Sequence, residues 1–364
     1  MSNFDVIIIG GGTAGLLLAR ELGKSQCKTL VLERKDNLLE FSFNTLGSFI
    51  NLQDFNLSKN VIAQKIDTAV IHSKTFKEKI KLHAYILDKK KVHEELLESI
   101  DRNFVKITLG INITDIIKDK ENKYSSVVDK NGLEYKAKIF VDASGTNGVL
   151  SKKVGLRKKK IDLATGVEYN VKYIGNPNEA HLMLGKAYQG GYGWIFPLKE
   201  SRAIIGFGTY DKKMIKGLKD RLNQIIELPN IKELVLKDND KVEGGSIPLT
   251  PVLDKFIDQN LVCVGDSVSQ VNPIVGEGYK FIFESTIMAS KSINESLKNN
   301  NLTCLSDYEM NWRKRFLSNY KRSKKAQGRI YKYSKSDFLT DMGMVLLRLR
   351  SNKKNIKTLT GEYK

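Results

Sequence analysis

The chain has 364 residues, a length that favours two domains, and its 41% hydrophobic and 28% charged residues are typical of a globular protein. Its formal net charge is +19, and the segment from Trp312 to Lys364 holds 16 Lys and Arg against three Asp and Glu, which is +13 of that total. A local excess indicates an anionic partner for this segment and argues against a protein that binds nucleic acid throughout.

Several other classes are excluded by composition and spacing. No apolar run reaches the roughly 18 residues of a membrane-spanning helix, and the apolar residues 6–9 lead directly into glycines without the basic region of a signal peptide. The cysteines and histidines are too scattered to predict a disulfide framework or a metal site, and reduced cysteines favour the cytoplasm. They are Cys27, Cys263, Cys304, His72, His83, His93 and His181.

The first 33 residues predict a nucleotide-binding βαβ unit. The apolar stretch 4–9 is typical of a strand that is buried on both faces, 16–22 is typical of a helix, and 29–33 of a second strand. The motif G-x-G-x-x-G stands between the first strand and the helix, which is its position in dinucleotide-binding folds.

Each motif residue has a physical role in such a unit. Gly10 permits a tight turn, Gly12 lets the backbone approach a pyrophosphate, and Gly15 allows the helix to pack closely on the strand. Glu33, at the end of the second strand, fits the hydroxyls of an adenosine ribose and would repel a 2′-phosphate, which favours FAD or NAD over NADP. A glycine-rich turn without a ligand is the alternative interpretation.

Two later strands favour FAD over NAD. Residues 137–145 read as a strand that ends in Asp-Ala-Ser-Gly, and 261–266 as an apolar strand that ends in Gly-Asp. An aspartate at the carboxyl end of a strand suits hydrogen bonding to ribityl hydroxyls. The glycine-bounded start of a helix over 279–297 suits the electron-rich edge of a reduced isoalloxazine ring.

A row of aromatic residues lies between these segments. Tyr192, Trp194 and Phe196 alternate, so on a strand their rings share one face, and Gly206 on the next strand leaves space opposite. A smooth apolar slot of this kind suits a hydrocarbon chain. The alternative is an ordinary aromatic stripe that packs the sheet onto its neighbour.

Together these motifs resemble the flavoprotein superfamily of para-hydroxybenzoate hydroxylase, and within it the geranylgeranyl reductases, from Asp5 to about Leu349. The segment 85–89 is similar to the family's tyrosine–Asp-Arg segment near the FAD phosphates, with Lys89 in place of the arginine. The residues assigned to FAD on this basis are Gly10, Gly12, Thr13, Ala14, Gly15, Glu33, Arg34, Lys89, Ala143, Gly145, Gly265, Asp266, Pro273, Gly276, Gly278 and Tyr279.

The aromatic segment resembles the Y-x-W-x-F-P motif that marks geranylgeranyl reductases and lines their prenyl-chain tunnel. The resemblance therefore implies a substrate site made of Tyr192, Trp194, Phe196, Pro197 and Gly206.

The expected fold is α/β, with a Rossmann-like FAD-binding domain in two pieces, 1–155 and 251–304. Residues 156–250 are expected to form an inserted antiparallel sheet that covers the flavin and carries the substrate slot, with strands at 166–174, 180–185, 191–197 and 202–209 and a helix over 212–228. Residues 305–364 are expected to form basic C-terminal helices.

The implied activity is FAD-dependent reduction of isolated C=C bonds in a prenyl lipid, with a hydride from flavin N5 and a proton from an acid. No side chain is singled out as that acid, and Tyr192, Glu277 and Tyr279 are candidates by expected proximity. A monooxygenase or halogenase, a lycopene-cyclase-like enzyme of the same superfamily, and a non-catalytic flavin protein that binds prenyl lipids are the alternatives.

The expected partners follow from the same features. A hydrophobic-chain slot beside a basic tail favours peripheral association with an anionic membrane surface over nucleic acid. A solvated basic helix face is the alternative. The single nucleotide fingerprint is assigned to FAD, so both NAD(P)H and a ferredoxin stay open as the electron donor, and the lipid and its number of reduced bonds stay open as well.

Overall fold

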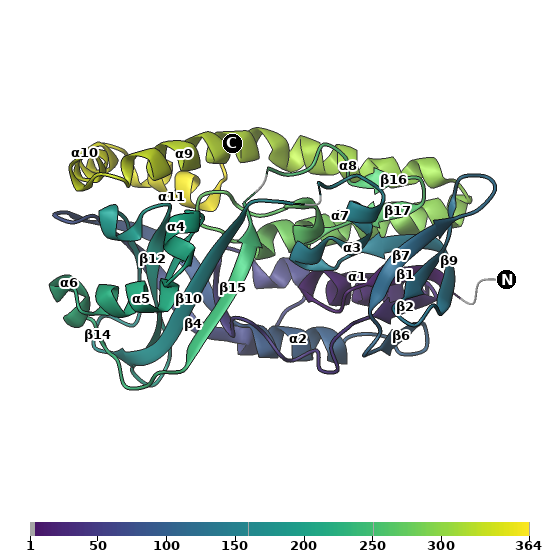
Figure 1. Cartoon of the computed structure of the whole chain (residues 1–364), viewed down its shortest axis with the longest axis horizontal. Helices are drawn as coiled ribbons and strands as arrows, with labels where there is room; N and C mark the ends of the chain where they lie inside the picture. The colour runs from purple at the N-terminus through teal and green to yellow at the C-terminus, as the bar shows by residue number, and fades with distance from the viewer. Residues whose placement is uncertain (1–3, 159, 250, 364) are drawn as a thin grey trace.

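The computed structural model describes residues 4–158, 160–249 and 251–363. The expected domain limits at residues 1, 250 and 364 therefore lie outside the described residues. Two β-sheets lie side by side along the long axis of the molecule, and C-terminal helices run along one side of both (Figure 1).

The first sheet has a parallel centre built on the predicted βαβ unit. β1 (Phe4–Ile9) pairs in parallel with β2 (Thr29–Leu32) and with β9 (Glu134–Asp142), and β17 (Leu261–Cys263) extends the sheet beyond β9. The register aligns Ile9 with Leu32 and with Asp142, so the carboxyl ends of these strands meet at one edge. In an open α/β sheet this edge is the usual ligand site.

Shorter strands and helices complete this sheet. Residues 6–9 of β1 and 30–32 of β2 are apolar and buried, as is typical of a sheet that is covered on both faces. α1 (Thr13–Lys24) lies against α7 (Tyr279–Asn299). The remaining elements of this half are β6 (Val105–Thr108), β7 (Ile113–Lys118), β8 (Tyr124–Asp129), β16 (Ile257–Asp258), α2 (Lys89–Glu98) and α3 (Val149–Lys153).

The second sheet is mixed and draws on two stretches of the chain. Its strands run in the order β14-β10-β13-β12-β11-β4-β5-β3, and β15 pairs with β10. All these pairs are antiparallel except that of β11 with β4, which is parallel. The strands are β3 (Thr45–Ser48), β4 (Ile62–His72), β5 (Lys77–Asp88), β10 (Leu163–Tyr173), β11 (Glu179–Met183), β12 (Gly191–Pro197), β13 (Arg202–Thr209), β14 (Val235–Leu236) and β15 (Val242–Pro248).

Two details differ from the sequence pattern. The pattern assigns residues 1–155 to the nucleotide-binding part, whereas β3, β4 and β5 pair within the second sheet. The helix expected over 212–228 is broken into α4 (Lys212–Ile215) and α5 (Leu218–Ile226), because Gly217 takes a positive φ of 90° between them. Leu222 of α5 packs beneath the sheet, and α6 (Pro229–Lys232) follows.

The C-terminal segment is helical, as expected. α8 (Ser306–Trp312) passes through a π-helical turn, Arg313–Leu317, into α9 (Ser318–Tyr333), and α10 (Asp337–Arg348) and α11 (Asn352–Thr360) follow. α8 lies beside the first sheet, while α9 and α10 extend over the second (Figure 1). Within the described ranges, no helix is both long enough and apolar enough to cross a bilayer.

Candidate active site

A cavity of about 400 Å³ lies where the two sheets meet. It collects residues from the glycine loop after β1, from the segment before α7 and from the aromatic strand β12. The sequence-predicted residues that line it are Gly12, Thr13, Ala14, Lys89, Ala143, Gly145, Tyr192, Trp194, Phe196, Asp266, Pro273, Gly276, Glu277, Gly278 and Tyr279. Segments predicted separately from sequence thus enclose one space.

The glycine loop is tightly constrained on its protein side and open on the other. A Cβ on Gly15 would lie 1.9 Å from the carbonyl oxygen of Gly10, and Gly10 itself has a φ of +109° with Ala143 O only 2.5 Å from its Cβ position. No protein atom lies within 4 Å of a Cβ on Gly12, which is the N-cap of α1 and has no side-chain cap. Free N–H groups and open space at a helix N-terminus are what a pyrophosphate requires.

Glu33 shapes the far side of this loop. Its Oε2 accepts a hydrogen bond from the Gly11 N–H at 2.6 Å, and its Oε1 accepts one from the Lys35 N–H at 2.9 Å. Glu33 and the exposed Arg34 do not line the cavity, and Gly265 lies behind it at the end of β17 with a φ of +68°.

Two aspartates near the carboxyl ends of β9 and β17 differ in role: Asp142 ends β9, and Asp266 lies in the turn after β17. Asp142 is buried and its carboxylate accepts hydrogen bonds from the Ser144 and Ser151 N–H groups, so it braces the turn that presents Ala143 and Gly145. Asp266 lines the cavity itself. Burial raises its pKa to about 6, against the opposing charge of Lys89.

Lys89 brings a cation into the cavity from the start of α2. Burial lowers the pKa of this ammonium, and the carboxylates of Asp266 and Glu168 oppose that shift. Its Nζ lies 5.0 Å from the centroid of the Phe41 ring. A lysine held in this way can interact with a phosphate as a point charge, although it lacks the bidentate geometry of an arginine.

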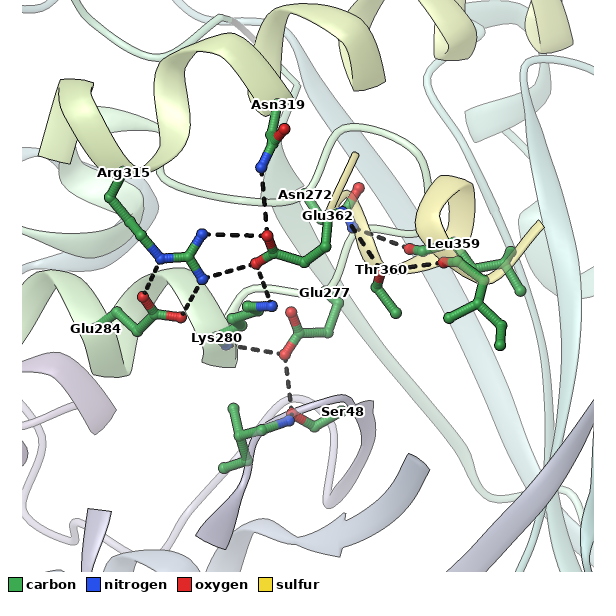
Figure 2. A network of polar contacts seen from close by, with 12 residues as sticks. Ser48, Asn272, Glu277, Lys280, Glu284, Arg315, Asn319, Leu359, Thr360 and Glu362 are labelled. Carbon is green, nitrogen blue, oxygen red and sulfur yellow. Dashed lines mark hydrogen bonds and ion pairs between the residues drawn. The ribbon is translucent and has the colours of Figure 1, made fainter. Parts of the chain in front are cut away.

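The start of α7 lies beside a buried carboxyl group that accepts one of the N–H groups of its first turn. Gly278 is the N-cap without a side-chain cap, and Glu277 Oε1 accepts hydrogen bonds from Ser48 Oγ at 2.9 Å and from the Lys280 N–H at 3.0 Å (Figure 2). Burial raises the pKa of Glu277 to about 7. The hydroxyl of Tyr279 accepts a hydrogen bond from Thr13 Oγ1 at 3.2 Å, which links α7 to the glycine loop.

A network of charges anchors the C-terminal turn against this part of the site (Figure 2). Glu362 accepts hydrogen bonds from Arg315 at 2.7 Å and pairs with Lys280, while Arg315 also donates to Glu284 at 2.8 Å. Segments from α7, the π-helical turn and the chain beyond α11 thus meet next to Glu277.

The aromatic row lies on the cavity side of β12 as predicted. Gly206 on β13, which was expected to form part of the substrate slot, has a different role. Tyr192, Trp194 and Phe196 are consecutive on one face, with centroids 5.8 and 6.3 Å apart. A Cβ on Gly206 would lie 2.3 Å from the Trp194 indole, so this glycine accommodates the indole and does not line the cavity. Pro197 is buried and is also absent from the lining.

Glu168, on β10, is a cavity residue that sequence reasoning missed. It is 4% exposed, its Oε2 accepts a hydrogen bond from Trp194 Nε1 at 3.1 Å, and its Oε1 has no partner. Burial raises its pKa to about 8, so the carboxyl group keeps its proton at neutral pH. The sequence carried no clear signal, because Glu168 shares its face of β10 with Asn170 and Lys172, opposite the apolar face of Tyr169 and Val171.

A second cavity of about 330 Å³ adjoins the first and was also missed from sequence. It lies between the second sheet and the helices α9, α10 and α11, and its lining is mostly apolar. Tyr192, Val275 and Tyr331 line both cavities, and the Tyr192 hydroxyl donates to the Val275 carbonyl oxygen at this boundary. The side chains of the second lining include Ile71, Ile80, Leu182, Leu184, Ile330, Met344, Leu347 and Leu359.

Comparison with known proteins identifies the family of this chain and its relatives. The family profile described as lycopene cyclase protein matches residues 5–359. The chain belongs to this family. The resemblance of this family member to geranylgeranyl reductases is also confirmed by its curated relatives. It is 28% identical to the digeranylgeranylglycerophospholipid reductase of Methanococcus aeolicus, over 86% of this chain and 83% of that protein. The reductase of the same name from Methanocaldococcus jannaschii is 25% identical over similar shares.

Solved structures confirm the α/β fold. A geranylgeranyl bacteriochlorophyll reductase-like protein from Thermoplasma acidophilum superposes with a TM-score of 0.82 and 22% identity, over 93% of this chain and 90% of that one. The flavin-dependent brominase Bmp2 gives a TM-score of 0.76 and 19% identity, over 99% of this chain and 94% of that one. The fold is therefore shared by proteins described as acting in different reactions.

Proposed function

We propose that this family member is an FAD-dependent reductase that saturates isolated C=C bonds in the prenyl chain of a lipid. One observation carries the proposal: a nucleotide loop, the start of α7 and an aromatic row line one cavity that adjoins a second, apolar one. The names of the curated relatives, digeranylgeranylglycerophospholipid reductases, support the same substrate class.

The residues fit FAD. Gly12 leaves the start of α1 open for the pyrophosphate, and Lys89 offers a cation to it. Glu33 holds the Gly11 N–H of the same loop. The start of α7 at Gly278 lies on the same cavity, and the positive end of its dipole suits the electron-rich edge of the ring system. When bound, FAD supplies the hydride chemistry, and the protein supplies position, exclusion of water and a proton.

We assign the proton to Glu168 Oε1 ahead of the three candidates that the sequence offered. The hydroxyl of Tyr192 donates its proton to the Val275 carbonyl oxygen, and Glu277 Oε1 accepts from Ser48 and the Lys280 N–H. The hydroxyl of Tyr279 accepts from Thr13, so the case against this residue rests on its acidity. Burial also raises the pKa of both tyrosines, which makes them weaker acids. Glu168 combines a pKa that is raised further above neutral than that of Glu277 with an Oε1 that has no hydrogen-bond partner.

The decisive experiment is anaerobic incubation of the reduced protein with digeranylgeranylglycerophospholipids, followed by mass spectrometry. The proposal expects two added hydrogens for each saturated bond and reoxidation of the flavin. Added oxygen or halogen would indicate the monooxygenase or halogenase, and an unchanged product mass with a new ring would indicate a cyclase. A flavin that stays reduced would indicate a binding protein without turnover.

The electron donor and the membrane belong to the same proposal. We assign the glycine loop to FAD, so the donor acts in a transient encounter, and anaerobic bleaching by NAD(P)H or by reduced ferredoxin distinguishes the two. The basic tail supports peripheral association with an anionic membrane surface. Lys321, Arg322 and Lys325 are exposed on α9 for this role, whereas Lys324 donates a hydrogen bond to the Leu249 carbonyl oxygen at 2.9 Å.

A further inference from the structure

α10 and its C-cap carry a continuous stripe of exposed apolar side chains. Six of the fourteen large hydrophobic residues exposed in the described ranges are gathered here, from Val345 at 38% to Leu349 at 80%. Their spacing of 1, 4, 7, 8 and 11 residues from the first puts them on one helix face. The stripe consists of Phe338, Leu339, Met342, Val345, Leu346 and Leu349. A contiguous apolar patch of this kind on a protein surface indicates an interaction site.

The opposite face of α10 holds the helix to the protein, so the outward direction of the stripe is fixed. Thr340 and Met344 are buried beneath it. At its sides, Asp341 accepts hydrogen bonds from the N–H and the hydroxyl of Thr75, at 3.2 and 2.7 Å, and Arg348 donates to Glu78 at 2.9 Å.

Charge around the stripe favours an anionic partner. Residues 331–354 contain six Lys and Arg and only two acids. Both acids face the protein, where Asp337 accepts from the Lys186 N–H at 2.8 Å and Asp341 from Thr75, and the net charge of this range is +4. The exposed cations are Lys332, Lys335, Arg348, Arg350, Lys353 and Lys354, and α10 lies at the end of the molecule opposite β1 (Figure 1).

The second cavity lies directly behind the stripe. Leu339 and Leu346 belong to the stripe and also to the lining of this cavity, together with Gly343 between them. An apolar surface that leads into an apolar cavity fits acyl or prenyl chains better than it fits the polar rim of a protein interface.

We propose that α10 inserts its apolar stripe into the headgroup–acyl boundary of an anionic bilayer, while the flanking lysines and arginines contact lipid phosphates. Apolar insertion combined with electrostatic attraction is the pattern of an interfacial helix. The docking itself does not depend on the redox reaction. Only its consequence, that lipid chains enter through the second cavity, rests on the proposed function.

The test measures cosedimentation with vesicles of phosphatidylcholine and phosphatidylglycerol. In the test variant Phe338, Met342 and Leu349 are replaced by Ser. All three are exposed and lie outside the cavity lining, so folding is retained, and we expect the bound fraction to fall at least tenfold. The matched control replaces three exposed apolar residues elsewhere, Leu133, Ile174 and Leu236, with Ser and keeps wild-type binding. Equal binding by the two variants would overturn the proposal, as would a wild-type protein that stays in the supernatant.

Two further measurements separate other occupants of the stripe and the proposed function. If the stripe joined two copies of the chain, light scattering would find a wild-type dimer and a monomeric test variant with unchanged vesicle binding, which would contradict the proposal. Reduction of detergent-solubilised lipid should be equal in wild type and test variant, while reduction of vesicle-borne lipid should fall in the variant. A wild-type protein that reduces neither substrate would contradict the reductase function and leave the docking result intact.

Discussion

The two adjoining cavities share a wall but differ in chemistry. The first contains Lys89, Asp266, Glu168 and Glu277, and all three carboxyl groups have pKa values raised by burial. The second is lined mainly by aliphatic side chains, with Arg329 and Arg350 among its few charges. Perturbed titratable groups mark sites of chemistry, whereas apolar walls accommodate chains without directing them. The difference indicates that reaction and chain binding are assigned to separate compartments.

The largest expected effect concerns the glycine loop, which lies on the first of the two cavities. Gly15→Ala should abolish flavin retention and destabilise the fold, because the new Cβ would lie 1.9 Å from a backbone oxygen. Gly12→Ala meets no protein atom within 4 Å, so its apoprotein should keep the wild-type melting temperature while flavin retention falls. Visible absorbance after desalting and thermal melts measure both effects. Wild-type flavin content in Gly12→Ala would show that the loop does not face the cofactor.

Glu168→Gln should reduce turnover by roughly 10²–10⁴-fold, the usual contribution of a general acid. In the wild type the rate should decline as pH rises through about 8, because Glu168 then loses its proton. The variant should lack this decline. Glu277→Gln is the matched comparison, since Glu277 Oε1 already accepts a hydrogen bond from Ser48. A larger loss of turnover in Glu277→Gln than in Glu168→Gln would reverse the assignment of the proton donor.

The raised pKa of Glu168 can also be tested without turnover, through the pH dependence of stability. Since its pKa in the folded protein is above the ordinary value, the folded state binds more protons than the unfolded chain between these two pKa values. The contribution of Glu168 to stability is therefore largest at acid pH and is lost as pH rises toward about 8. Asp266 and Glu277 add slopes of the same sign, so the measurement is the difference between wild-type and Glu168→Gln apoprotein melts across this range.

The second cavity can be narrowed without touching the first. Gly343 lines it and has no atom within 4 Å of its Cβ position, so Gly343→Phe should fold and obstruct the passage. We expect roughly tenfold slower reduction of long prenyl lipids, within the range of steric discrimination in apolar pockets. Short prenyl substrates should be unaffected. Gly328→Phe on α9 has equal space outside the lining and serves as the control. Equal losses on short and long chains would contradict separate compartments.

The smallest expected effect is on stability and concerns the network of charges around Glu362. Glu362→Gln weakens the contacts to Arg315 and Lys280, which are partly exposed, so we expect a loss of about 1 kcal/mol in the free energy of unfolding. Chemical denaturation measures it. Removal of the charge should leave flavin binding unchanged, because Glu362 does not line the first cavity.

Local patterns predicted much of the site. Gly10, Gly12 and Gly15 have steric requirements that act within a few residues, and the alternation of Tyr192, Trp194 and Phe196 fixes a common face. These features therefore appear in sequence before any tertiary contact is known.

Other features depend on contacts between distant segments. The parallel pairing of β4 with β11 joins residues about 110 positions apart, and no local pattern specifies it. Glu168 is one acid among many until Trp194 and the surrounding walls bury it. The use of Gly206 to accommodate an indole, and not a ligand, also requires knowing which residue lies opposite.

The spread of the first cavity along the chain has a consequence for synthesis. Its lining begins at Gly12 and ends at Tyr331, with walls from both sheets and from α9. A nascent chain exposes the glycine loop early, but the lining is complete only when Tyr320 and Tyr331 of α9 have left the ribosome. Non-local contacts of this kind form late in folding. A ligand that binds only the finished cavity stabilises the complete fold by mass action. It therefore binds at the last step of folding and does not nucleate the fold.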